Sequence, residues 1–208
     1  MDNIKNIIFD LGNVLLDIDY DKTIHAFEQL GFTDFKAHYS GAEMDTLFKD
    51  IEKGMIGEAI FYESLQAVSK QPVTDEQLKN AWNAMLLDFR VESLEYLTKI
   101  SSRYKLYLLS NTNSIHLAEF EAILKRDTGK TNLAGYFTTA YYSNLVGMRK
   151  PDQEIYSFVL ADAGLVANET LFIDDLANNI EGAQATGLKT YQLLAGERIE
   201  KLPFIAVQ

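Results

Sequence analysis

Four polar segments of this chain each follow, or lie close to, an apolar run of the kind that forms a buried strand. Their side chains include carboxylates, hydroxyls, amides and a lysine, which are groups that hold divalent cations and phosphoryl groups. Ligands of open α/β sheets bind at the carboxyl ends of the strands. The four segments are Asp10 after Ile7-Ile8-Phe9, Ser110-Asn111-Thr112-Asn113, Gly147-Met148-Arg149-Lys150-Pro151-Asp152, and Asp174-Asp175.

The acids Asp10, Asp174 and Asp175 could form a metal site. Two adjacent acids at the end of one strand repel each other unless a cation neutralises them, and a site made only of oxygens suits Mg²⁺. The backbone carbonyl of Gly12 could supply a further oxygen. The alternative is that Asp174-Asp175 only caps the helix that follows.

Ser110, Asn111 and Thr112 could cradle a phosphate or a carboxylate, because they offer two hydroxyls and an N–H just past a strand end. The alternative is a cap on the next helix, a role that Ser, Thr and Asn often fill. Lys150 precedes a proline that can occupy the first turn of a helix, and it could hold both the phosphate and the nucleophile. Its neighbour Arg149 is expected to be a solvated charge.

Other chemistries find little support in the sequence. No two of the three histidines have metal-ligand spacing, and His116 is expected on a helix surface. The chain contains no Gly-x-x-x-x-Gly-Lys-Ser/Thr loop, no Gly-x-Gly-x-x-Gly segment and no Gly-x-Ser-x-Gly elbow. A serine hydrolase is therefore disfavoured.

The composition narrows the choice of partner and compartment. The chain has 208 residues, of which 47% are hydrophobic, and it has no cysteine, which excludes disulfides and thiolate metal sites. A net charge of -11 argues against nucleic acid, although a small phosphorylated substrate needs only a local cluster of cations or N–H groups. No apolar run approaches the roughly 20 residues that span a bilayer. We expect a cytoplasmic monomer or homodimer without a membrane partner.

The elements that must position these residues alternate along most of the chain. Strands are predicted at 5–10, 105–110, 136–142, 170–174 and 189–194, with helices at 92–100, 115–124, 152–163 and 180–185 between the later ones. This alternation predicts an α/β fold with a parallel sheet covered on both faces. Right-handed crossovers then bring Asp10, Ser110 and Asp174 to one edge, although they lie far apart in sequence.

The segment from Tyr20 to Phe89 has helical spacing throughout, and no strand is predicted in it. A capping box of Thr74 and Gln77 starts its last helix, which is expected to continue to Phe89. We therefore predict an all-helical cap at 19–89, inserted into a core of 1–18 and 90–208. Within the cap, Met55-Ile56 is predicted to contact the substrate and select it.

Together the four segments resemble the motifs of the haloacid dehalogenase superfamily, in order and over essentially the whole chain. Within it, the chain is similar to the small-cap phosphatases and most similar to the bacterial α-D-glucose-1-phosphate phosphatase group. The segments that carry the resemblance are Phe9-Asp10-Leu11-Gly12-Asn13-Val14, Leu109-Ser110-Asn111-Thr112, Lys150-Pro151-Asp152 and Ile173-Asp174-Asp175.

The resemblance implies a three-layer Rossmann-like core and a mechanism of phosphomonoester hydrolysis. Asp10 would attack phosphorus and form an aspartyl-phosphate, which water then hydrolyses. Mg²⁺ would be held by Asp10, the Gly12 carbonyl and Asp175. Asp174 would be a further ligand, or it would lie next to the ligands without binding the metal itself.

The resemblance further implies that Ser110, Asn111 and Lys150 bind the phosphoryl oxygens. The substrate would be a small phosphorylated metabolite, and a sugar phosphate is the expected class.

The chain departs from this family pattern at Gly12, where most phosphatases of the superfamily have a second Asp as general acid and base. A good leaving group could need less protonation, Asp17 or Asp19 could replace the missing acid, or catalysis could be lost and leave a phospho-ligand-binding protein. A dehalogenase remains an alternative, but it needs no metal, so the Asp174-Asp175 pair disfavours it. A phosphomutase must move protons on sugar hydroxyls, and Gly12 counts against it.

Overall fold

The computed structural model describes residues 3–33, 35 and 42–203, and it contains a five-stranded sheet in the order β5-β4-β1-β6-β7. Every neighbouring pair in this sheet is parallel, as predicted from the alternating pattern. The strands are β1 (Asn6–Phe9), β4 (Lys105–Ser110), β5 (Thr139–Tyr142), β6 (Thr170–Asp174) and β7 (Lys189–Gln192).

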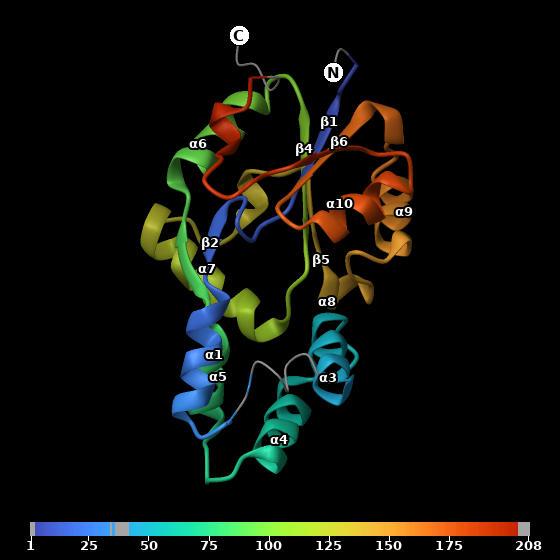
Figure 1. Cartoon of the computed structure of the whole chain (residues 1–208). Coiled ribbons are helices and arrows are strands. Elements are labelled where there is room, and N and C mark those ends of the chain that lie inside the picture. Colours follow the sequence, from blue (N-terminus) through green and yellow to red (C-terminus); the bar gives the residue numbers. More distant parts are fainter. Residues whose placement is uncertain (1–2, 34, 36–41, 204–208) are drawn as a thin grey trace.

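Helices cover both faces of the sheet, which gives three layers (Figure 1). Side chains of a strand alternate between the faces, so Ile7 and Phe9 of β1 pack against one helical layer and Ile8 against the other. The first layer contains α6 (Val91–Ile100) and α7 (Ser114–Thr128), and the second contains α9 (Gln153–Asp162) and α10 (Ala177–Gln184). The predicted α/β fold with a Rossmann-like core is thus confirmed.

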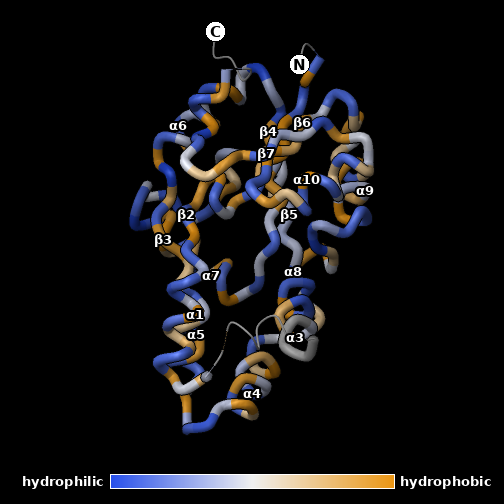
Figure 2. Tube along the Cα trace, viewed as in Figure 1, coloured by the Kyte–Doolittle hydropathy of each residue, from blue (hydrophilic) through white to orange (hydrophobic). Residues whose placement is uncertain are grey.

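The hydropathy of the chain follows this layering (Figure 2). The central strand β1 is buried along its whole length, whereas the covering helices alternate between hydrophobic and hydrophilic segments. Such a helix buries one stripe against the sheet and leaves the rest to solvent. No helix among the described residues is both long and apolar enough to cross a membrane.

The segment before Phe89 corrects one prediction. The last helix of the insertion, α5 (Asp75–Asn83), ends well before Phe89, and β3 (Leu86–Phe89) pairs antiparallel with β2 (Leu16–Ile18). The apolar spacing of this segment also fits a helix, because four-residue apolar runs do not distinguish the two structures. Its strand state depends on hydrogen-bonding partners supplied by β2, which lies far away in the sequence.

The helices between β2 and β3 have an aromatic core of their own. Those that the structure describes are α1 (Tyr20–Gln29), α3 (Ala42–Glu52), α4 (Glu58–Val68) and α5, and they lie beyond the carboxyl ends of the sheet strands (Figure 1). Trp82 of α5 is nearly fully buried and stacks on Phe48 of α3, with ring centroids 4.8 Å apart. The predicted capping box at Thr74 and Gln77 is present and begins α5.

Shorter elements adjust other predicted boundaries. The strand expected from residue 136 begins at Thr139, after a 3₁₀ turn at Leu133–Gly135. The short helix α8 (Ser143–Val146) follows β5, and further 3₁₀ turns lie at Ala167–Glu169 and Ile199–Lys201. Helix α9 begins only at Gln153, so Pro151 precedes the helix instead of occupying its first turn.

Candidate active site

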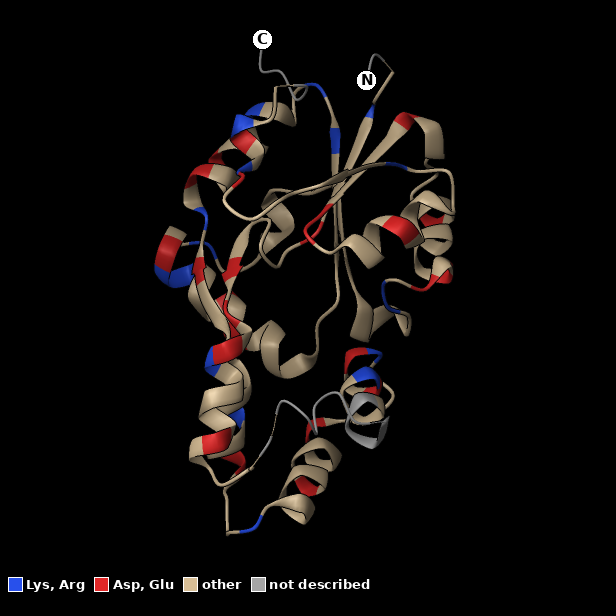
Figure 3. Ribbon diagram, in the orientation of Figure 1, with Lys and Arg blue, Asp and Glu red and all other residues tan. Residues whose placement is uncertain are grey.

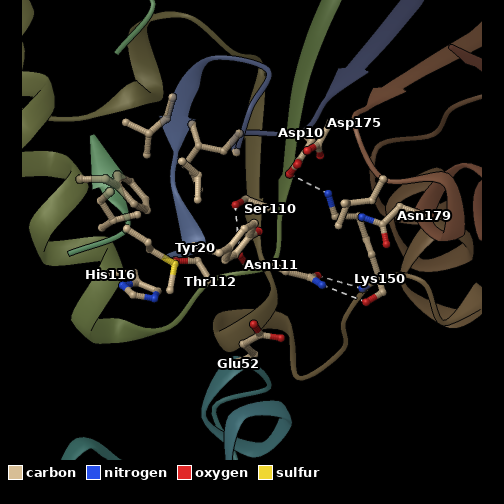
Figure 4. Close-up of a pocket in the computed structure, with 18 of the residues that line it drawn as sticks. Asp10, Tyr20, Glu52, Ser110, Asn111, Thr112, His116, Lys150, Asp175 and Asn179 are labelled. Carbon is tan, nitrogen blue, oxygen red and sulfur yellow. Dashed lines mark hydrogen bonds and ion pairs between the residues drawn. The ribbon is translucent and has the colours of Figure 1, made fainter. Parts of the chain in front are cut away.

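Most of the residues predicted to hold a phosphate or a metal line one cavity of about 210 Å³ at the carboxyl edge of the sheet (Figure 4). The parallel strands bring them there, because β1, β4 and β6 all end at this edge. In Figure 3 the loop that follows β6 is red, which marks the acidic end of this strand. The predicted residues that line the cavity are Asp10, Gly12, Ser110, Asn111, Thr112, Lys150 and Asp175.

Lys150 forms hydrogen bonds with two of the acids, Asp10 and Asp174. Its side chain is 1% exposed, and its Nζ donates to Asp10 Oδ1 at 2.7 Å and to Asp174 Oδ2 at 2.6 Å. Burial by itself would lower the pKa of Lys150, but the carboxylates of Asp10 and Asp174 outweigh it and raise the pKa above its ordinary value. The lysine therefore carries a fixed positive charge next to Asp10.

Both carboxylate oxygens of Asp174 accept hydrogen bonds from the protein. It is fully buried, and its Oδ1 accepts hydrogen bonds from the backbone N–H of Leu176 at 2.9 Å and from Asn179 Nδ2 at 3.0 Å. Its Oδ2 accepts from Lys150. These contacts make Asp174 a residue that positions Lys150, and they leave its oxygens little freedom to approach a cation in the cavity.

Asp175 points toward the cavity and is oriented by Asn13. Asn13 Nδ2 donates to Asp175 Oδ2 at 3.1 Å, while Asn13 Oδ1 accepts from the backbone N–H of Ile18 at 3.1 Å. Asn13 has a φ of 53°, a left-handed conformation that asparagine tolerates better than most residues. This local turn sets the direction of the Asp175 carboxylate.

The chemistry of this donor set fits a divalent cation. Asp10, Asp174 and Asp175 can each offer an oxygen within 4.8 Å of the others, and Lys150 balances only part of their charge. Burial raises the pKa of Asp10 to about 7 and also raises the pKa of Asp175. Asp10 and Asp175 line the cavity, so they are the carboxylates best placed to bind Mg²⁺.

The polar residues at the end of β4 and just after it differ in their contacts with the rest of the protein. Asn111 clamps the backbone of Lys150, because its Nδ2 donates to the Lys150 carbonyl and its Oδ1 accepts from the Lys150 N–H, both at 2.9 Å. The backbone of Thr112 is bound to the Ser143 hydroxyl. The Ser110 hydroxyl makes only a 3.5 Å contact with the next carbonyl. The hydroxyls of Ser110 and Thr112, which both line the cavity, are therefore the side-chain groups of this segment available to bind a phosphoryl oxygen.

Sequence reasoning missed the part of the site that the helical insertion contributes. Arg149 was expected to be solvated, but its Nε donates to Glu52 of α3 at 2.8 Å, and the two side chains are only 21% and 22% exposed. Both residues line the cavity. Ninety-seven positions separate them, so no local pattern could have indicated the pair.

His116 was expected on a helix surface, and this prediction was wrong. The residue is only 8% exposed, because α7 carries it against α5, where its ring stacks on Trp82 at a centroid distance of 4.8 Å. Its Nδ1 lies 2.8 Å from Asn83 Oδ1. Burial lowers the pKa of His116 to about 3, so the ring is neutral at physiological pH.

This neutral histidine should make the stability of the protein depend on pH. The pKa of His116 falls from its ordinary 6.5 to about 3 on folding, so between these values the unfolded chain binds the additional proton. The free energy of unfolding should therefore decrease as the pH falls through this range, by up to about 1.4 kcal/mol per pH unit from this residue. Urea unfolding of wild type and His116→Phe as a function of pH measures the difference. Parallel curves would contradict a buried neutral His116.

Three other sequence predictions concern side chains that lie away from the cavity. Met55 is 68% exposed, and Ile56 packs against the aromatic core of the insertion, so neither lines the cavity. Asp17 accepts from Arg90 Nε at 2.7 Å, and Asp19 caps α1 by accepting from the backbone N–H of Asp21. In this structure neither acid lies where it could replace the side chain missing at Gly12.

Comparisons with known proteins agree with this geometry. A family model described as haloacid dehalogenase-like hydrolase matches residues 4–187. The chain is 33% identical to a D-ribitol-5-phosphate phosphatase of Bacteroides thetaiotaomicron over 91% of both proteins. A HAD family enzyme of that organism, crystallised with magnesium and inorganic phosphate, is 37% identical with a TM-score of 0.83, over 93% of this chain and 96% of that one. A HAD-like family hydrolase of Porphyromonas gingivalis is 31% identical with a TM-score of 0.84, over 94% and 93% of the two chains. The chain belongs to the haloacid dehalogenase-like hydrolases.

Proposed function

We propose that this protein is a Mg²⁺-dependent phosphomonoester hydrolase that acts on a small sugar or polyol phosphate through an aspartyl-phosphate intermediate. The observation that carries the proposal is the arrangement around Asp10, which faces the cavity with Lys150 Nζ 2.7 Å from its carboxylate. Ser110 and Asp175 line the same cavity. The similarity to a D-ribitol-5-phosphate phosphatase supports both the reaction and the class of substrate.

In the proposed reaction, the Asp10 carboxylate attacks phosphorus in line with the leaving alcohol, and water then hydrolyses the acyl-phosphate. Lys150 and the Ser110 hydroxyl bind the phosphoryl oxygens and orient the group for attack. Asp10, Asp175 and the Gly12 carbonyl would hold Mg²⁺, which neutralises charge on the phosphoryl oxygens when bound. Asn111 and Asp174 keep Lys150 in place from opposite sides.

We further propose that residues 19–89 act as a cap over this edge of the sheet. Two polar contacts connect the α3–α4 part of the insertion to the core. They are the Glu52–Arg149 ion pair and the hydrogen bond from Ser114 to Glu58 at 2.7 Å. A cap held in this way would exclude water from the acyl-phosphate and contact the leaving group.

The acids around the cavity favour a phosphatase over a dehalogenase. Displacement of halide from carbon by an aspartate needs no metal, whereas Asp10 and Asp175 line the cavity as carboxylates that could hold one. A phosphatase uses this acidic cluster, and a dehalogenase would have to tolerate its repulsion.

A panel of simple phosphate esters tests the proposal. With Mg²⁺ present, we expect p-nitrophenyl phosphate to be hydrolysed about 10²-fold or more faster than n-propyl phosphate, because Gly12 cannot protonate a poor leaving group. No hydrolysis of any ester would contradict the proposal and favour a phospho-ligand-binding protein. Equal rates for both esters would contradict the role assigned to Gly12.

A variant at Gly12 sharpens this test. An ideal Cβ at Gly12 would lie 2.9 Å from Cδ1 of Ile18, the end of a flexible side chain, so Gly12→Asp needs only a local shift. Combining it with Ile18→Val removes that contact. We expect the double variant to hydrolyse n-propyl phosphate faster than wild type, with Gly12→Ala and Ile18→Val together as the matched control. An increase in the control as well would assign the effect to space and not to the new acid.

A further inference from the structure

The cavity extends beyond Asp10 and Ser110 toward the helical insertion, where Trp82, Met85 and Leu86 line it together with Tyr20 and the Glu52–Arg149 ion pair. In Figure 4, His116 lies on the opposite side of the cavity from Asp10, with Tyr20 and Thr112 between them. The leaving group of a substrate bound at Asp10 would extend into this space.

A hydrogen-bonded series of three side chains favours one tautomer of His116. Asn83 Nδ2 donates to Glu119 Oε2 at 3.4 Å, and because a carboxylate only accepts, this contact orients the amide. Asn83 Oδ1 then points to His116 Nδ1 at 2.8 Å. An amide oxygen also only accepts, so this arrangement favours the neutral imidazole with its proton on Nδ1.

The other ring nitrogen is left as an acceptor. With the proton on Nδ1, Nε2 of His116 carries a lone pair, and no described residue donates a hydrogen bond to it. His116 lines the cavity, and Trp82 stacks against the ring and holds its plane. A neutral acceptor that is oriented in advance and lines a cavity is suited to bind a hydroxyl group.

We propose that Nε2 of His116 accepts a hydrogen bond from a hydroxyl of the leaving alcohol and so selects polyol or sugar phosphates over phosphates of apolar alcohols. This inference rests on the proposed function, because it places the phosphoryl group of the ligand at Asp10. An apolar alcohol would bury Nε2 without a donor, which disfavours its binding. His116 would then be a specificity residue that takes no part in bond breaking.

The test compares two substrates in matched variants. The probes are D-ribitol 5-phosphate and n-pentyl phosphate, which have the same chain length and differ in their hydroxyls. His116→Phe keeps a ring against Trp82 but has no acceptor, and we expect it to lower the ratio of the two kcat/KM values by about tenfold. His116→Gln can donate to Asn83 and still offer an oxygen to the cavity, so we expect it to restore part of the ratio.

A second histidine provides the control. His25 lies on α1 with its side chain 71% exposed and outside the cavity, so His25→Phe should leave the ratio at its wild-type value. Equal losses with both substrates in His116→Phe would overturn the proposal and assign His116 to structure alone. Failure of His116→Gln to exceed His116→Phe, with both variants folded, would also overturn it.

A binding measurement separates this inference from the proposed function. In ¹⁵N-labelled Asp10→Asn protein with Mg²⁺, long-range ¹H–¹⁵N spectra should show His116 protonated on Nδ1 and unprotonated on Nε2. D-ribitol 5-phosphate should shift the Nε2 resonance, and n-pentyl phosphate should shift it less. This readout needs no turnover. If the wild type hydrolyses no phosphate ester and the labelled Asp10→Asn protein still gives these shifts, the proposed function is overturned and the inference is supported. A ring protonated on Nε2, or equal shifts from both ligands, would overturn the inference.

Discussion

Replacing Asp10 by Asn should reduce turnover by about 10⁴-fold or more, since an amide cannot attack phosphorus and form an acyl-phosphate. The fold should survive, because Asn retains an oxygen that accepts from Lys150 Nζ, and Lys150 keeps its bond to Asp174. Burial raises the pKa of Asp10 to about 7, so the charged carboxylate costs stability in the metal-free protein. In the presence of a chelator, Asp10→Asn should therefore unfold at or above the wild-type temperature.

Two measurements check this assignment. Steady-state rates with p-nitrophenyl phosphate give the loss of activity, and beryllium fluoride bound to wild type should be found on Asp10. Ser110→Ala is the matched comparison, because it removes a proposed oxygen ligand and leaves the nucleophile in place. Activity in Asp10→Asn close to that of wild type, or a phosphoryl mimic on another side chain, would rule out Asp10 as the nucleophile.

Removal of divalent cations should abolish hydrolysis, and Mg²⁺ should restore it. Asp174 and Asp175 make different contacts, so replacing each of them by Asn should affect a different property of the protein. Asp175 lines the cavity, and Asp175→Asn should raise the Mg²⁺ concentration needed for half-maximal activity. Asp174 is fully buried and accepts charge-assisted bonds, so Asp174→Asn, which leaves Lys150 its bond to Asp10, should mainly lower the free energy of unfolding, by on the order of 2 kcal/mol.

Mg²⁺ titrations of activity and urea unfolding of both variants distinguish these roles. Full activity in excess chelator would rule out the metal. A larger effect of Asp174→Asn than of Asp175→Asn on the Mg²⁺ requirement, at unchanged stability, would reverse the assignment of ligand and positioning residue.

Much of the core could be predicted from the sequence, because its signals are local. Buried parallel strands appear as continuous apolar runs, and Asp10, Ser110 and Asp174 each lie at or just past the end of such a run. The parallel arrangement then brings the ends together. The residues of the candidate site were therefore predicted by position, and the structure brings them together at one edge of the sheet.

The orientation of those residues depended on the tertiary structure. The sequence does not show that Asn111 clamps the backbone of Lys150, or that Asp174 is enclosed while Asp175 faces the cavity. Adjacent residues have different surroundings here because their side chains point in different directions from one backbone. Only the folded neighbours distinguish a ligand from a positioning group.

The helical insertion contains features that local sequence patterns could not predict. Helical spacing identified most of its helices, but the β2–β3 pair, the Glu52–Arg149 contact and the burial of His116 against Trp82 all join segments that are distant in the chain. Local periodicity reports which face of an element is apolar, and it carries no information on which element will cover that face. The sequence by itself determined which polar residues lie at the strand ends. The tertiary structure decided which side chains of the insertion and of α7 line the cavity, because packing between distant segments sets their burial and their hydrogen-bonding partners.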